Sequence, residues 1–581
     1  MSDIIKILPS DVSNKIAAGE VVQRPSSVLK ELIENSIDAN STRIQIIIKD
    51  AGKNLIQVID NGKGMSKNDM HLSFIKHATS KINKIEDIFS ISSMGFRGEA
   101  LAAISSVSML EMESINDNQN GHFIEINGGE LLSEKDSNIQ EGTSIKIKNI
   151  FYNVPARRNF LKSDFVELRH ILDVFHRLAI SHPEIEFSFI NNEEEIFYLK
   201  HESLNKRIIS IFGEKIRENL IPINESTQIA NISGFVLKPE FSKKSRSNQF
   251  VFVNNRFIKS QFISHSISAS FEGLLKDGYH PGYFMFIEID PTKIDVNVHP
   301  NKTEIKFDDD QNLYSIINSS VKHCLGIYQV SPVLDFDKDP SMDISYDQVK
   351  SQPTNPTIEI NSEFNPFKVF NGEEVSKIIN DDMTSDNELN FEDDNNQALK
   401  IFQILNKFIV STNKSSLIII NQNLAHQRIL YESFLKSIFE NSVNSQKLVF
   451  PIELSLTKKQ LLLYNKIIDE FKSIGFEIIV KNELMLIESI PFGIEKNNVE
   501  EVIENILNED FNTSNDFSAS DFFAKRLSKI TSIKSGQKLN SDEQEYIVNH
   551  LFSCKEPNLS PDNKQIFITL NKNDIENKFN G

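Results

Sequence analysis

The chain has 581 residues and a net charge of −19, and 39% of its residues are hydrophobic. This length is too great for one hydrophobic core, so two to four domains are expected. No apolar run reaches the roughly 18 residues of a membrane-spanning helix. Two cysteines, Cys324 and Cys554, exclude a disulfide framework and a four-cysteine zinc site. Residues 1–10 lack a signal-peptide pattern, so we expect a cytoplasmic protein.

The first strong pattern predicts a helix over residues 26–39. Pro25 suits the first position of a helix, and no glycine or proline interrupts the run that follows. Glu31, Asn35 and Asp38 are spaced so that they form one polar stripe along this helix. Such a stripe is either a solvated face or one wall of a binding site.

Two short strands follow, at 43–49 and 55–59, with a turn at 51–54 between them. The second strand ends at Asp60, and Gly62 and Gly64 come directly after it. A carboxylate at a strand end can accept a hydrogen bond from an exocyclic amine such as that of adenine. The glycines allow the backbone to approach a flat ring or a phosphate closely. A surface turn is the alternative interpretation.

Glycine-flanked segments come next. His77 to Lys81 precedes the stretch Gly95 to Leu101, which runs into a helix predicted at 99–105. Free amides at the start of a helix make an anion site. Residues 76–98 are polar and end in glycine, which is typical of a lid over a nucleotide. Gly142 and Thr143 then precede a strand at 144–150.

In this order the motifs resemble the ATPase domain shared by gyrase, a heat-shock chaperone, histidine kinases and the MutL family. The sequence motifs are most similar to those of the MutL family of DNA mismatch repair proteins, at residues 17–22, 31–39, 77–81, 95–101 and 151–161. The resemblance implies an ATP- and Mg²⁺-dependent homodimer whose N-terminal domains associate on binding ATP. Such a dimer couples the mismatch sensor MutS to a downstream nuclease or helicase.

The resemblance also implies roles for individual residues. Glu31 would be the base that orients the attacking water, and Asn35 would hold Mg²⁺. Asp60 would bind adenine, Thr143 would share a water with it, and Lys302 would reach the γ-phosphate. The other nucleotide-binding positions would be Gly62, Gly64, Thr79, Ser80, Lys81, Gly95, Phe96, Arg97, Gly98, Glu99, Ala100 and Leu101. By resemblance, turnover should be slow, because the bound state acts as a switch.

The expected fold class is a multidomain α+β chain. Residues 1–214 would form the ATPase α/β sandwich, with a mixed sheet covered by helices on one face, and 215–330 a ribosomal S5-like transducer domain. Residues 331–397 would be a disordered acidic linker, since they carry 16 acidic and 4 basic side chains. Residues 398–581 would form an α+β dimerisation domain with an inserted subdomain at about 447–500. Its expected elements are strands at 399–410, 416–420, 476–480 and 484–490 and helices at 426–439 and 456–474.

Basic residues in the first two domains suit sequence-independent contacts to DNA phosphates. Most of the excess negative charge lies in residues 331–397, and the two ends of the chain are near neutral, so we expect a modest affinity that depends strongly on salt. The candidates are Arg157, Arg158, Lys243, Lys244, Arg246, Arg256 and Lys259.

Many members of the family carry a metal-dependent nicking site, and the matching stretch here is residues 421–432. Asn421, Asn423 and Gln427 stand where the family pattern has Asp, His and Glu, and a neutral amide is a poor ligand for such metals. Two further motifs, at 528–534 and 560–565, lack their cysteines. We therefore expect nicking activity to be lost. The alternative is an atypical site built from His426, Glu432 and Asp562.

A topoisomerase subunit or a chaperone of the same superfamily is a further alternative. The first should carry a tyrosine-based cleavage domain, and the second a long middle domain. The wording at residues 95–101, 151–158 and 296–302 argues against both.

Overall fold

The computed structural model describes most of the chain outside one long central segment. It covers residues 18–19, 21–81, 94–95, 98–116, 120–276, 278–295, 305–328, 401–413, 416–440, 445–481, 484–491, 494, 496–508 and 519–571. The candidate residues Phe96, Arg97 and Lys302 lie outside these ranges. So do the expected linker at 331–397 and residues 82–93 of the expected lid.

The N-terminal part is an eight-stranded sheet in the order β5-β4-β3-β6-β2-β1-β7-β8. Its neighbours are antiparallel except for the parallel pair β1–β7, so the predicted mixed sheet is confirmed. The strands are β1 (Arg43–Lys49), β2 (Leu55–Asp60), β3 (Met109–Ser114), β4 (Gly121–Asn127), β5 (Glu130–Ser137), β6 (Thr143–Lys148), β7 (Glu186–Asn191) and β8 (Glu194–Leu199).

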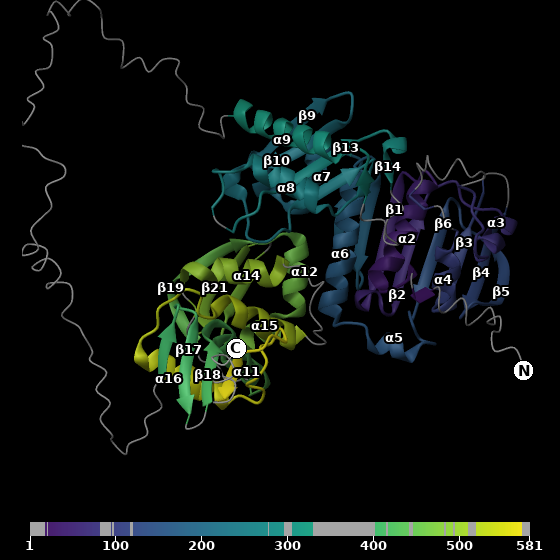
Figure 1. Ribbon diagram of the computed structural model, residues 1–581. Helices are drawn as coiled ribbons and strands as arrows, with labels where there is room; N and C mark the ends of the chain where they lie inside the picture. The colour runs from purple at the N-terminus through teal and green to yellow at the C-terminus, as the bar shows by residue number, and fades with distance from the viewer. Residues whose placement is uncertain are drawn as a thin grey trace, which may run out of the picture.

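Helices cover one face of this sheet (Figure 1). Helix α2 (Pro25–Asp38) packs against β2 and against α6 (Asp164–Ser181), and α4 (Ala100–Ser106) packs against β4. Helix α2 buries Val28, Leu29 and Leu32 because these residues recur on one side of it. The shorter helices are α3 (Lys67–Leu72), α5 (Pro155–Asn159) and α7 (Leu204–Phe212).

A second sheet, in the order β12-β11-β13-β10-β9, follows α7 and carries helices α8 and α9. Phenylalanine rings join its core to that of the first sheet. Phe250 and Phe284 stack with ring centroids 5.3 Å apart, and Phe212 lies 5.2 Å from Phe284. All three pack in one apolar cluster with the core of the first sheet. The elements are β9 (Leu220–Ser226), β10 (Asn231–Leu237), β11 (Gln249–Val253), β12 (Arg256–Phe257), β13 (Tyr283–Glu288), β14 (Ile294–Asp295), β15 (Lys306–Phe307), α8 (Gln261–Ser270) and α9 (Asp310–Ile327).

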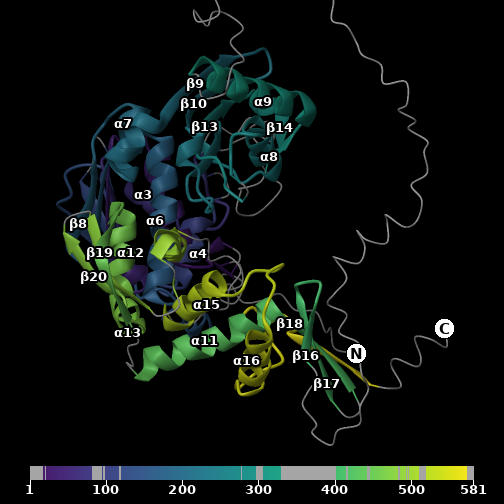
Figure 2. The same ribbon diagram turned by 90° about the vertical axis from the view of Figure 1, so that its left-hand side faces the viewer.

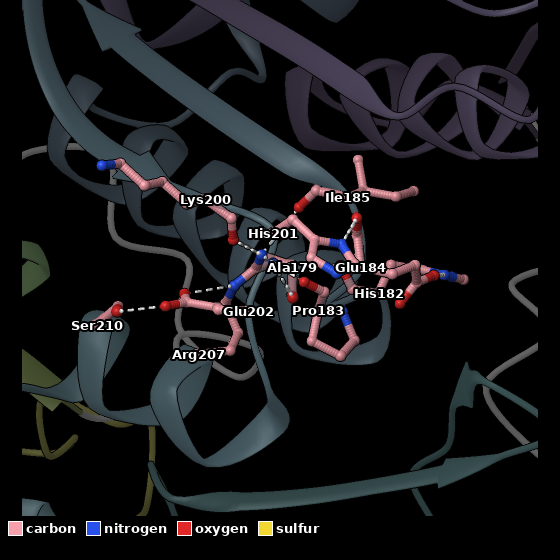
Figure 3. Close-up of polar contacts among 10 residues, drawn as sticks. All are labelled: Ala179, His182, Pro183, Glu184, Ile185, Lys200, His201, Glu202, Arg207 and Ser210. Atoms are coloured by element: carbon pink, nitrogen blue, oxygen red, sulfur yellow. Dashed lines mark hydrogen bonds and ion pairs between the residues drawn. The ribbon is translucent and has the colours of Figure 1, made fainter.

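One buried arginine ties the end of α6 to β7, β8 and α7 (Figure 3). The Arg207 side chain is fully buried. Its guanidinium donates to five backbone carbonyls at 2.7–3.2 Å, and its Nε donates to Glu202 at 3.0 Å. The carbonyls belong to Ala179, His182, Pro183, Ile185 and Lys200. Burial lowers the pKa of Arg207, and Glu202 opposes that shift.

The C-terminal part contains two sheets, in the orders β16-β17-β18-β22 and β19-β21-β20. Helix α11 (Gln422–Glu440) packs against α15 and α16, and the predicted α+β character is confirmed. The remaining elements are β16 (Ile401–Ile404), β17 (Phe408–Asn413), β18 (Ser416–Asn421), β19 (Ser445–Ser455), β20 (Glu477–Lys481), β21 (Leu484–Pro491), β22 (Phe567–Asn571), α12 (Lys458–Lys466), α13 (Ile468–Ile474), α14 (Val499–Asn508), α15 (Ala519–Thr531) and α16 (Ser541–Phe552).

Two of the predicted elements in this part are wrong. The strand expected at 399–410 is a hairpin, because Leu405 and Asn406 adopt φ values of 54° and 47° and form its turn. The helix expected at 456–474 is divided in two at Ile467, where φ is −128° and ψ is 20°. The Ile467 side chain is fully buried at this break.

The C-terminal part rests on helix α6 of the N-terminal part, and both views show α12 beside α6 (Figures 1 and 2). Asp173 of α6 forms an ion pair with Lys459 of α12. Phe165 of α6 lies against Phe522 of α15, with ring centroids 5.7 Å apart. Among the described helices, none has the length and apolar character that a bilayer crossing needs.

Candidate nucleotide-binding site

Asp60 ends β2, directly opposite Thr143 of β6. The residue is 8% exposed, and its carboxylate accepts hydrogen bonds from a hydroxyl and a backbone amide. Ser36 Oγ donates to one oxygen at 2.8 Å, and the Gly62 amide donates to the other at 2.9 Å. Burial raises the pKa of Asp60, and these hydrogen bonds oppose the rise. The carboxylate is therefore held in a fixed orientation and keeps acceptor capacity for an amine of a ligand.

The loop after Asp60 passes close to another part of the backbone. Gly64 has a φ of 62°, and a Cβ built on it would lie 1.8 Å from the Ile115 carbonyl oxygen. Only glycine fits there. Thr143 Oγ1 lies 2.9 Å from Ser114 Oγ, and that hydroxyl also accepts the Met65 amide at 2.9 Å. Asp60, Gly62, Gly64 and Thr143 are thus brought together, as the sequence predicts.

The polar stripe of α2 meets the start of the expected lid. Asp38 accepts the Met94 and Gly95 amides at 2.9 and 3.1 Å. The Lys81 ammonium lies 2.5 Å from the Asp38 carboxylate and donates to Asn35 Oδ1 at 3.2 Å. Lys81, which we predicted to bind the nucleotide, thus contacts α2 in this structure, and the Gly95 amide, which we expected to face a phosphate, faces a carboxylate.

The two glycine-flanked segments contact each other. The His77 amide donates to the Gly98 carbonyl at 3.0 Å, and a Cβ on Gly98 would lie 2.3 Å from the Ala78 carbonyl oxygen. Thr79 Oγ1 accepts the Lys81 amide at 3.1 Å, whereas Ser80 is exposed. Glu99 precedes α4, and Ala100 and Leu101 form its first turn.

Glu31 differs from the other carboxylates of α2. Glu34 is 6% exposed and lies 3.5 Å from Lys30, and Asp38 holds the lid segment as described above. Glu31 is half-buried, and within the described ranges no hydrogen bond or ion pair involves its carboxylate. It is thus the carboxylate of this helix with capacity to orient a water molecule.

The predicted DNA contacts lie in different surroundings. Arg158, Arg246 and Lys259 are exposed. Arg157 lies over the Phe151 ring, 4.3 Å from its centroid, and donates to the Val22 carbonyl. Lys243 and Lys244, which precede β11, form ion pairs with Glu504 and Glu501 of α14, respectively.

Arg256, another predicted DNA contact, lies partly inside the protein. Its side chain is half-buried, and burial lowers the pKa of its guanidinium. Glu34 and Asp38 of α2 oppose that shift, so the guanidinium is close enough to interact electrostatically with both carboxylates. Its role in DNA binding stays a prediction.

Sequence reasoning missed the serines that orient the site. Ser36 is on the apolar side of α2 and Ser114 is buried at the end of β3. For Ser36 the sequence did contain a signal. A hydroxyl on the apolar side of a helix needs a hydrogen-bond partner, and Asp60 at the end of the neighbouring strand can supply one.

Comparison with known proteins identifies the family. The DNA mismatch repair protein MutL of Christiangramia forsetii is 46% identical over 617 residues, and the match covers 100% of both chains. This chain belongs to the MutL family of DNA mismatch repair proteins. The MutL protein of Flavobacterium johnsoniae is 42% identical over 652 residues, again with 100% of both chains covered.

Three family models match successive parts of the chain. Residues 23–155 match the histidine kinase-, DNA gyrase B- and HSP90-like ATPase, 208–326 the C-terminal domain of the DNA mismatch repair protein, and 401–539 the MutL C-terminal dimerisation domain. The chain is therefore a MutL-type repair protein with an ATPase domain, and the predicted family is confirmed.

Solved structures also match. The N-terminal domain of a DNA repair protein has a TM-score of 0.48 at 24% identity, with 55% of this chain and 99% of that chain covered. The Aquifex aeolicus MutL ATPase domain complexed with ADP has a TM-score of 0.36 at 26% identity, with 47% and 94% covered.

In the MutL dimerisation domain, the residues that replace the metal-ligand pattern bind one another. Asn423 Nδ2 donates to the Ile533 carbonyl at 2.6 Å, and Gln427 Nε2 donates to Asn423 Oδ1 at 2.9 Å. His426 Nδ1 accepts the Ile533 amide at 3.1 Å. The amides thus form a hydrogen-bonded network where the family pattern has ligands.

The two remaining acidic candidates, Glu432 and Asp562, lie in different surroundings. Glu432 accepts the Lys555 amide at 2.9 Å and lies 3.0 Å from Arg428 Nε. Asp562 is exposed. Within the described ranges, no group of three or more His, Cys, Asp or Glu residues is arranged to hold a metal ion.

Replacing Asp60 by asparagine should weaken ATP binding by about 1–3 kcal/mol, roughly 5- to 150-fold. An asparagine turns one acceptor into a donor, which would then face Ser36 Oγ or the Gly62 amide.

In the native protein, ATP binding should weaken as the pH falls through the pKa of Asp60. Because burial raises that pKa, the loss should begin above the pH at which an ordinary aspartate, with a pKa of 3.8, protonates.

Titration calorimetry of the variant, and of the native protein across a pH series, measures both effects. Asp136→Asn, on the exposed edge strand β5, is the matched control. Equal ATP affinity in the two variants would contradict the role of Asp60.

Proposed function

We propose that this protein is a nucleotide-switched mismatch repair ATPase that hydrolyses ATP slowly and requires Mg²⁺. The observation that carries the proposal is the arrangement around α2. The buried Asp60 carboxylate binds Ser36 of this helix, while Glu31 and Asn35 lie further toward its N-terminus on the polar stripe. Adenine bound at Asp60 would direct the phosphates along α2 toward Glu31, which would orient the attacking water.

The side chains near Asn35 suit Mg²⁺ held mainly by phosphates and water. Asn35 supplies one neutral oxygen, which accepts a hydrogen bond from the Lys81 ammonium. Magnesium commonly takes few protein ligands and completes its shell with phosphate oxygens and water. The ion would neutralise phosphate charge, and Lys81 would exchange Asn35 for a phosphate oxygen when the lid closes. Gly95 to Leu101 and Lys302 would complete the phosphate site.

We further propose the domain limits 1–214, 215–330, 331–397 and 398–581. The family models support these limits. The match at 23–155 lies inside the first domain, the match at 208–326 begins just before the second domain and covers most of it, and the match at 401–539 lies inside the fourth. The three-stranded sheet β19-β21-β20, which is separate from the four-stranded sheet, supports an inserted subdomain at about 447–500.

The proposed partners are MutS, a downstream nuclease or helicase, DNA and a second copy of this chain, in the cytoplasm. The match to a dimerisation domain supports the homodimer. Exposed apolar side chains on its four-stranded sheet also support it, because such side chains are typical of an interface. They are Phe402, Ile404, Leu405 and Ile568.

We propose that the chain does not nick DNA itself. His426 and Glu432 retain ligand chemistry, but each already accepts a backbone amide. Asn421, Asn423 and Gln427 supply only neutral amides, which bind divalent metals weakly.

The test is nicking of supercoiled plasmid with Mn²⁺ by the full chain, measured beside ATP turnover. We expect turnover without nicked product. Nicking that disappears in His426→Ala or Glu432→Ala would establish instead the alternative, an endonuclease with an atypical site. An absence of ATP turnover would contradict the proposed function as a whole.

A further inference from the structure

Helix α14 of the C-terminal part places two carboxylates on two of the predicted DNA-contact lysines. Lys243 Nζ lies 2.5 Å from Glu504 Oε1, and Lys244 Nζ lies 2.7 Å from Glu501 Oε1. Residues 501 and 504 are three apart on one helix, so they project from the same face. The two lysines are adjacent in sequence, and the backbone of Lys243 is fixed by paired hydrogen bonds with His280 at 2.7 and 3.2 Å.

We propose that α14 is an internal competitor for DNA: its two glutamates occupy the ammonium groups that would otherwise contact phosphates. This inference rests on the proposed DNA role of Lys243 and Lys244. A carboxylate and a phosphate oxygen are both anionic acceptors for an ammonium group. Because Lys243 and Lys244 are occupied by α14 when the C-terminal part is docked, docking and DNA contact at these lysines exclude each other.

Contacts on α6 hold α14 in place, away from the lysines themselves. Phe165 and Val166 of α6 are 2% and 3% exposed and pack in the apolar cluster of the C-terminal part, which also contains Val502, Ile503 and Phe522 of α14 and α15. A partly buried ion pair joins the same helix, through Asp173, to Lys459 of α12. Apolar burial is typical of the core of a specific interface, and breaking a partly buried ion pair destabilises the contact that it forms.

These contacts separate two roles. The apolar side chains and the Asp173–Lys459 pair dock the two parts, and the Glu501 and Glu504 carboxylates cover the basic surface. The exposed candidates Arg158, Arg246 and Lys259 stay available in the docked arrangement. Weak DNA binding would thus persist when α14 is docked, and release of α14 would add two phosphate contacts and steepen the dependence on salt.

The first experiment compares Glu501→Lys with Glu545→Lys in the full chain. Both variants change the net charge equally, but Glu545 is an exposed residue of α16, on the far side of the C-terminal part (Figure 1). Affinity for a short duplex at fixed salt should rise roughly two- to fivefold more in Glu501→Lys, as expected for the loss of one such ion pair. An equal rise in both variants would overturn the proposal.

A second pair of variants tests the docking contacts without touching the lysines or the glutamates. Asp173→Lys and Lys459→Asp each leave two like charges opposed, and each should raise DNA affinity. The double variant restores an opposite-charge pair and should return affinity to the native value. Single variants that leave DNA affinity unchanged would overturn the proposal, and circular dichroism confirms that each variant is folded.

A crosslinking measurement separates failure of docking from failure of the DNA role. Carbodiimide joins contacting amines and carboxylates, so Lys243–Glu504 and Lys244–Glu501 products should form without DNA and diminish when duplex is added. If neither product forms, docking itself is overturned. If both products form but a Lys243→Ala, Lys244→Ala variant binds DNA as the Glu501→Lys chain does, the proposed DNA role of these lysines has failed instead.

Discussion

Alanine in place of Glu31 is expected to abolish ATP turnover while leaving ATP binding intact. Positioned general bases contribute about 10²- to 10⁴-fold to rate, and the loss should be of that size. Binding should persist, because the proposed adenine contact is made by Asp60, which is oriented by Ser36 and Gly62. The measurement is steady-state phosphate release, with nucleotide affinity determined on the same preparation.

Glu31→Gln sharpens the test, because it keeps the size of the side chain and removes only its basicity. Glu186→Gln, on β7 of the same sheet, is the matched control and should keep native turnover. Full turnover in Glu31→Gln would assign the base to another group. Equal loss of binding and turnover would show that Glu31 supports the shape of the site.

Methionine in place of Arg207 should lower the free energy of unfolding of the ATPase part by about 3–5 kcal/mol. The change leaves Glu202 without its cation and removes the donor from five carbonyls. Arg207→Lys should fall between the native protein and Arg207→Met, since an ammonium keeps the charge but has three donors in place of five.

Differential scanning calorimetry of the full chain measures this effect. The transition that shifts when ATP is added belongs to the part that binds ATP, so it can be followed among the transitions of a multidomain chain. Arg217→Met removes an exposed arginine that pairs with Glu214, and it should stay within about 0.5 kcal/mol of native. Equal melting temperatures for the two methionine variants would contradict the structural role of Arg207.

The parts of the site that could be predicted are those set by local spacing. Glu31, Asn35 and Asp38 share one stripe because a helix repeats every 3.6 residues. Asp60 lies at a strand end because the apolar run stops there. Both features depend on fewer than about 15 neighbouring residues and on motif wording, so the sequence alone contained them.

Features that depend on distant residues could not be predicted in this way. The Ser36–Asp60 hydrogen bond depends on how α2 is oriented relative to β2. The burial and charge environment of Arg256 depend on the position of the second sheet relative to α2. The break at Ile467 could not be predicted because no glycine or proline lies within residues 456–474 to mark it. The hairpin at Leu405 and Asn406 is different, since asparagine is a known turn residue and the signal was overlooked.

The phenylalanine contacts between the first two sheets have a consequence for how the molecule moves. Phe250 and Phe284 belong to the same buried cluster as the core beneath the proposed ATP site, and Phe212 packs against this cluster. A hinge between the two sheets would have to open that cluster and expose the rings to water, which is costly for aromatic side chains. The two sheets should therefore unfold in one transition and should move as one rigid body. A small movement of the lid at Lys81 would then be transmitted to the distant strands β9 and β10 as a rotation of the whole body.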